Sequence, residues 1–193
     1  MKPTNSTREY GMKIASDVRS RTVAGWALMT AGVLYATFHG SAILADAGDD
    51  WWWLGLLVHA FLILSLMVGL IGARHRLDLE GWAGTIWTAS TVLAFLGVTV
   101  GHVFWSAAMI GIAAVALVVL NRRIVAAVMT IGAIGWLYLY ITGVRVGDEN
   151  GRLITATEIR TAVLALTLMA AGMVALGANV AGHVEPRVEP SSV

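Results

Sequence analysis

Three histidines lie in or beside apolar stretches of the chain, and theirs are the side chains best suited to chemistry there. His39 and His59 each lie inside a run without Asp, Glu, Lys or Arg, and His102 lies in a short glycine-containing stretch. An ionisable side chain inside an apolar helix is costly, so its presence raises the question of function. An imidazole can ligate haem iron, copper or zinc, and it titrates near neutral pH.

Two kinds of ligand site would use His39 and His59 together. Two imidazoles on facing helices can ligate a haem b from both sides, which predicts a cofactor site for electron transfer. Together with His102, the pair could instead bind a transition metal, with the acidic segment Asp46–Asp50 attracting the cation. The histidines could also pass protons or gate a permeant without any cofactor.

Each histidine also has an explanation that requires no ligand. A neutral imidazole near a helix end can donate to a backbone carbonyl or reach the headgroup layer, and for each residue alone this is the stronger explanation. The similar depth of His39 and His59 on consecutive helices favours a shared role. Tyr35, one turn before His39, is expected to hydrogen-bond to it. We expect His75 and His183 to be solvated.

The composition determines the elements that position these residues. Of the 193 residues, 58% are hydrophobic and only 13% are charged, and the mean hydropathy is +0.75. Soluble domains carry roughly a quarter charged residues, so the chain has about half of the usual charge. A bilayer can accommodate that much apolar surface, whereas a soluble core of this size cannot. The chain is therefore predicted to be an all-α membrane protein.

Uncharged runs indicate six transmembrane helices, since each pass needs about 20 apolar residues. The forty-residue run 81–120 is too long for one pass, and we place its turn in the stretch Gly97–His102. The six-helix domain covers 22–183, between a segment 1–21 that could form an amphipathic helix and a tail 184–193. The six predicted helices are 22–45, 51–73, 81–98, 102–120, 124–144 and 160–182.

The basic residues predict the orientation of these helices. Positive charges collect on the cytoplasmic side of a membrane protein. With six passes, only Arg145, Arg152 and Arg160 fall on the outer side, which places both termini in the cytoplasm of a plasma-membrane protein. The ten inner-side basic residues are Lys2, Arg8, Lys13, Arg19, Arg21, Arg74, Arg76, Arg122, Arg123 and Arg187.

Tryptophans should mark the two membrane interfaces, because indoles favour the headgroup layer. Trp51–Trp53 and Trp105 would mark the outer level, and Trp26 and Trp82 the inner level. The sequence Ala45-Asp46-Ala47 resembles a signal-peptidase site, but the preceding apolar run is of spanning length, so we expect the first helix to be retained.

Small residues spaced by four predict close helix contacts, within the bundle or with another copy or a membrane-complex partner. These pairs are Gly97 with Gly101, Ala36 with Gly40, Ala107 with Gly111 and Ala178 with Gly182. Thr85, Thr88 and Thr91 could line a polar path, although hydroxyls that bond to their own helix are the simpler explanation. Thr157 is the expected cap of the last helix.

The remaining features limit the function classes. The chain has no cysteine, so disulfides and thiolate chemistry are excluded. The net charge of +1 provides no basic field for nucleic acid. Nucleotide, zinc-protease and serine-hydrolase motifs are missing. The first expectation is therefore a non-enzymatic small-solute or ion permease, a channel, or a membrane subunit of a larger complex. The alternatives are the bis-histidine haem or metal protein and a structural anchor.

Overall fold

The computed structural model describes residues 22–39, 52–142 and 155–182, and these residues form six α-helices. The prediction of an all-helical chain with six helices is confirmed. The first helix covers 22–39, and the others are α2 (Trp52–Arg76), α3 (Gly81–Thr99), α4 (His102–Val118), α5 (Arg123–Ile141) and α6 (Ala156–Gly182).

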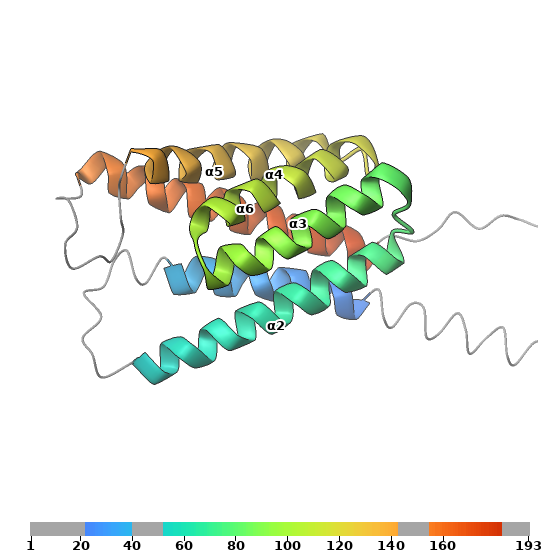
Figure 1. Ribbon diagram of the computed structural model, residues 1–193, viewed down its shortest axis with the longest axis horizontal. Helices are drawn as coiled ribbons and strands as arrows, with labels where there is room; N and C mark the ends of the chain where they lie inside the picture. Colours follow the sequence, from blue (N-terminus) through green and yellow to red (C-terminus); the bar gives the residue numbers. More distant parts are fainter. Residues whose placement is uncertain (1–21, 40–51, 143–154, 183–193) are drawn as a thin grey trace, which may run out of the picture.

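The helices run up and down in one elongated bundle (Figure 1). The three consecutive pairs from α3 to α6 pack closely, whereas α2 lies at the edge of the bundle and meets α3 less closely. Arg74, Arg76, Arg122 and Arg123 lie at the same end of the bundle, which we call the arginine end. The first helix begins and α6 finishes at this end.

Glycines let the first helix fit between α2 and α6. A Cβ atom at Gly25 would overlap Ala181 and the carbonyl oxygen of Gly177 on α6. A Cβ atom at Gly69 of α2 would lie 2.7 Å from Cγ of Leu28. Close approach of small residues is a main source of helix association where lipid replaces water. These glycines are not part of the small-residue pairs that the sequence suggested.

The connections at the arginine end use polar residues in the left-handed region. Asp78 follows α2 with φ of 48°, and Asn121 follows α4 with φ of 51°. Asn and Asp tolerate this conformation better than other residues with a side chain. It lets the Leu79 amide donate to the Arg74 carbonyl and the Arg122 amide donate to the Ala116 carbonyl. Both bonds satisfy carbonyls that the helix itself leaves open.

The forty-residue uncharged run is divided inside the stretch to which its glycines pointed. α3 ends at Thr99 and α4 begins at His102. The two helices are in immediate contact beyond the turn, because a Cβ atom at Gly97 would overlap the backbone of Trp105. Of the sequence-derived pair Gly97 and Gly101, only Gly97 makes such a contact, while a Cβ atom at Gly101 would meet nothing.

The last helix begins earlier than its predicted start at residue 160. The Thr155 amide donates to Oε2 of Glu158 at 2.8 Å, and the Glu158 amide donates to Oγ1 of Thr155 at 3.2 Å. This reciprocal pair is a capping box, which satisfies two amides at the start of a helix. The expected cap at Thr157 was therefore wrong by two residues.

Four helices are long and apolar enough to cross a membrane by length and composition: Leu54–Arg76 of α2, α3, α5 and Thr157–Gly182 of α6. The outer surface of the bundle carries many large apolar side chains. Solvent-exposed apolar patches of that extent are rare on soluble monomers. Examples more than half exposed are Trp26, Val33, Leu56, Phe61, Leu64, Trp82, Val92, Ile131, Ile134, Leu164.

One interhelical hydrogen bond joins α2 and α3 in the interior. Nε1 of Trp87, a fully buried residue, donates to the Leu70 carbonyl at 2.8 Å. We expect Trp87→Phe to lower the free energy of unfolding in detergent by about 1–2 kcal/mol, because it removes this bond and leaves a carbonyl without its second partner. Trp82→Phe on the exposed face of α3 is the matched control and should change stability little. Equal effects of the two substitutions would contradict a structural role for the bond.

Candidate functional site: a histidine–aromatic cluster

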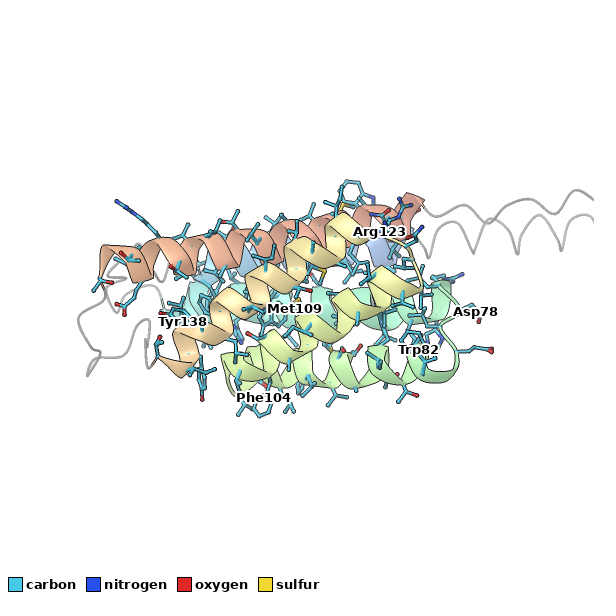
Figure 2. The ribbon with its side chains drawn as sticks, turned by 90° about the horizontal axis from the view of Figure 1, so that it is seen from above. Asp78, Trp82, Phe104, Met109, Arg123 and Tyr138 are labelled. Carbon is cyan, nitrogen blue, oxygen red and sulfur yellow. The ribbon has the colours of Figure 1, made fainter. Side chains whose placement is uncertain are left out.

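Five ring-bearing side chains from three helices meet in the half of the bundle away from the arginine end, and the buried Ser106 follows one of them in the sequence. In Figure 2, Phe104, the residue before Trp105, lies at the opposite end of the bundle from Arg123, and Met109 lies deeper in the bundle. We call these six residues the histidine–aromatic cluster: Tyr35, Phe38 and His39 of the first helix, His59 of α2, and Trp105 and Ser106 of α4.

The first helix contributes the centre of the cluster. Tyr35 and His39 are one helical turn apart, and their ring centroids are separated by 4.5 Å with an interplanar angle of 59°. On its other side the Tyr35 ring stacks on Trp105, with centroids 4.3 Å apart and an angle of 24°. Offset stacking at this distance is a favourable aromatic geometry. The first helix is therefore fixed against α4 at the level of the cluster.

Phe38 connects the two histidines. Its ring centroid lies 5.1 Å from that of His39 and 5.2 Å from that of His59. Gly55, one turn before His59 on the same face of α2, lies beside this ring, since a Cβ atom there would be in ordinary van der Waals contact with it at 3.7 Å. The structure thus brings His39 and His59 into one neighbourhood.

Several polar atoms of the cluster are buried and have no hydrogen-bond partner among the described residues. They are Oη of Tyr35, Nδ1 of His59, Nε1 of Trp105 and Oγ of Ser106. Nε2 of His39 is buried in the same cluster. Most buried polar atoms in proteins have a partner, because losing water without a replacement costs free energy. These four atoms make the cluster the candidate site among the described residues.

Beyond the cluster, toward the arginine end, the core is apolar and closed. Leu28 of the first helix, Leu62 and Leu66 of α2 and Met109 of α4 are all 0% exposed. They lie one or more turns deeper than the cluster residues on the same helices. The described core thus separates the polar cluster from the arginine end.

The position of Phe38 bears on the haem alternative. A haem held from both sides would need the two imidazoles in one neighbourhood. The Phe38 ring contacts both, with centroids 5.1 Å from that of His39 and 5.2 Å from that of His59. Haem binding by His39 and His59 stays a prediction.

The transition-metal alternative uses two or three of the histidines as ligands. The described residues contain no group of three or more His, Asp or Glu side chains placed to hold a metal ion. The side chain of His102 and the segment Asp46–Asp50, which completed this prediction, lie outside the described part. Metal binding by His39 and His59 stays a prediction.

Two expectations for residues of the cluster were wrong. Oη of Tyr35 has no hydrogen-bond partner among the described residues, because its ring packs against the His39 imidazole instead of pointing its hydroxyl at a ring nitrogen. Trp105 does not mark a membrane interface, since it is fully buried against Tyr35. Trp26 and Trp82 are more than half exposed, as interface residues would be, and Trp51–Trp53 lie outside the described side chains.

Sequence reasoning missed Phe38 and Ser106 entirely. Ser106 has no sequence signal, since a single serine in an apolar helix usually bonds to its own backbone. The threonines of α3 do so: Thr85, Thr88 and Thr91 donate to the carbonyls of Gly81, Gly84 and Trp87. These bonds agree with the simpler explanation, that the hydroxyls bond to their own helix.

Comparison with known proteins gives no match: no protein family, no curated protein and no solved structure is significantly similar to the chain.

The partnerless hydroxyl of Tyr35 leads to a prediction about stability. We expect Tyr35→Phe to raise the free energy of unfolding of the ligand-free protein by about 1 kcal/mol, because it removes a buried oxygen without a partner and keeps the stacked ring. Tyr138→Phe, on an exposed residue of α5, is the control and should have no effect. Chemical unfolding in detergent measures both. A clear loss of stability in Tyr35→Phe would show that the hydroxyl has a structural partner.

Proposed function

We propose that the chain is a multi-pass protein of the plasma membrane that crosses the bilayer six times with both termini in the cytoplasm. Four candidate spans, an apolar outer surface and four arginines at one end of the bundle support this. The positive-inside rule makes the arginine end cytoplasmic. The histidine–aromatic cluster then lies in the outer half of the membrane.

Within this frame we propose a non-enzymatic permease for small uncharged polar solutes, with the histidine–aromatic cluster as its binding site. The observation that carries the proposal is the set of four buried polar atoms, on three different helices, that have no hydrogen-bond partner among the described residues. Substrate sites of membrane transporters lie between helices and present a few polar groups in apolar surroundings. A structural anchor would have no reason to keep such atoms without partners.

The chemistry of the cluster limits the solute. Nε1 of Trp105 can only donate, whereas Tyr35, Ser106 and a neutral His59 can each donate or accept. The solute should therefore offer at least one acceptor, such as a carbonyl or hydroxyl oxygen, together with donors. No charged side chain belongs to the cluster while its histidines are neutral, which favours an uncharged solute over an ion.

Passage to the cytoplasm requires a second conformation. In this structure the apolar core formed by Leu28, Leu62 and Leu66 closes the cytoplasmic side of the cluster. The first helix lies between Leu62 and Leu66 of α2 and the close contact that Gly25 makes with α6. Movement of the first helix would therefore open the side of the cluster that faces the arginine end. Small residues at such contacts allow helices to slide without large side chains colliding.

Solute flux into proteoliposomes tests this function. We expect vesicles with the protein to take up urea, acetamide or glycerol faster than protein-free vesicles in stopped-flow light scattering. His59→Phe should reduce the protein-dependent rate at least about fivefold, the loss of one hydrogen bond. The matched control is Phe61→Leu, a substitution on the exposed face of the same helix. Rates equal to those of protein-free vesicles for all three solutes would contradict the proposal.

The absorption spectrum of the same preparation tests the electron-transfer alternative. That alternative is supported by the common contact of His39 and His59 with Phe38. The permease proposal predicts no Soret band, because it assigns the cluster to a solute rather than to a haem. A Soret band that disappears in both His39→Ala and His59→Ala would replace the permease with a bis-histidine haem protein.

A further inference from the structure

A groove on the outer surface of the bundle lies between α2 and α3, close to the arginine end. It has a volume of about 340 Å³, which is within the range of sites that hold a small molecule. Met67 and Ile71 of α2 form one wall, and Val92 and Phe95 of α3 form the other. Arg74 and His75 line its end near the arginine end.

The groove is amphipathic along its length. Its α2 side runs over eight residues from Met67 to Arg74, roughly 11 Å at 1.5 Å per residue, which approaches the ~15 Å depth of one hydrocarbon leaflet. Thr88 and Thr91 also line it, but their hydroxyls donate to carbonyls of their own helix at 2.7 and 2.9 Å. The walls therefore offer apolar surface, and the polar groups are confined to one end.

Arg74 places a positive charge at that end of the groove, beside His75. Arg74 and His75 are both exposed on the surface, and an arginine presents several donors that match phosphate oxygens. Two acids, Asp78 and Glu80, follow in the turn but do not line the groove. The groove thus combines an apolar channel with a basic group at the depth of the headgroups.

The groove is also held open by the fold. Trp87 and Leu70, which immediately precede Thr88 and Ile71, are joined by the 2.8 Å hydrogen bond between α3 and α2. That bond fixes the spacing of the two helices beside the groove. A site of fixed width that faces lipid is suited to an acyl chain rather than to a folded protein.

We propose that this groove binds an anionic phospholipid of the cytoplasmic leaflet, with its phosphate at Arg74 and His75 and one acyl chain between α2 and α3. Basic sites between helices on the cytoplasmic side are a known kind of anionic-lipid site. The proposal rests on the membrane orientation proposed above, and it does not depend on solute binding by the histidine–aromatic cluster.

Lipid titration of the full-length protein in detergent tests the proposal, with bound lipids counted by native mass spectrometry. We expect phosphatidylglycerol to bind more tightly than phosphatidylcholine with the same chains. Arg74→Gln should weaken phosphatidylglycerol binding about fivefold, the contribution of one basic group near a lipid surface. Arg123→Gln, at the same end but outside the groove, is the charge control and should leave binding unchanged.

Filling the groove provides a second, independent variant. Val92→Trp places an indole in the groove at an exposed position, so we expect it to abolish the tight phosphatidylglycerol site. Ile131→Trp on the exposed face of α5 is the size control and should retain it. Glycerol 3-phosphate, which carries the phosphate without acyl chains, should not displace the lipid.

Three outcomes would overturn the lipid proposal. Equal losses in Arg74→Gln and Arg123→Gln would show general attraction to a basic surface. Tight binding retained in Val92→Trp would place the lipid elsewhere. Displacement by glycerol 3-phosphate would show a phosphate site rather than a lipid site. A failed permease assay would affect none of these results, because the variants lie outside the histidine–aromatic cluster.

Discussion

The arrangement of this molecule depends on how six helices pack when their outer surface is apolar. The hydrophobic effect, which drives helix association in water, does not distinguish a leucine against lipid from a leucine against another helix. Close backbone contact and a few interior hydrogen bonds must take its place. Gly25 and Gly69 provide that contact on either side of the first helix, and Trp87 provides the bond between α2 and α3.

The same packing explains why polar atoms without partners collect at one level. Interior positions toward the arginine end are mostly apolar, and the buried Trp87 there has its partner in the Leu70 carbonyl. Toward the other end, the Trp105 ring of α4 stacks on Tyr35 and the His59 ring of α2 packs against Phe38 at a tilted angle, and both rings carry buried polar atoms. Leaving these atoms unsatisfied costs stability, and proteins tolerate that cost chiefly at functional sites.

Much of the fold could be predicted from the sequence, because long uncharged runs indicate the helices and glycine-rich stretches between them indicate the turns. The six helices and the break near Gly97–His102 were readable in this way. Helix ends were less so: the cap of α6 depends on the reciprocal bonds of Thr155 and Glu158, which a choice of Thr157 missed. The left-handed residues Asp78 and Asn121 gave no clear signal, since Asp and Asn are equally common in ordinary loops.

The candidate site was predictable only in part. The similar depth of His39 and His59 in consecutive helices predicted that their side chains lie close together. In the structure both rings pack against Phe38. The contribution of α4 could not be predicted, because helix rotation is set by packing that a single sequence does not reveal. Trp105 therefore looked like an interface residue, although its ring lies inside the bundle on Tyr35.

Thiol labelling of single-cysteine variants in intact cells tests most directly whether lipid surrounds the bundle with its arginine end in the cytoplasm. The chain has no cysteine of its own, and Gly101 and Glu80 lie in turns at opposite ends of α3. A membrane-impermeant maleimide should label Gly101→Cys in intact cells and Glu80→Cys only after lysis. Labelling of both variants before lysis, or the reverse order, would contradict the membrane arrangement on which the proposed solute and lipid sites depend.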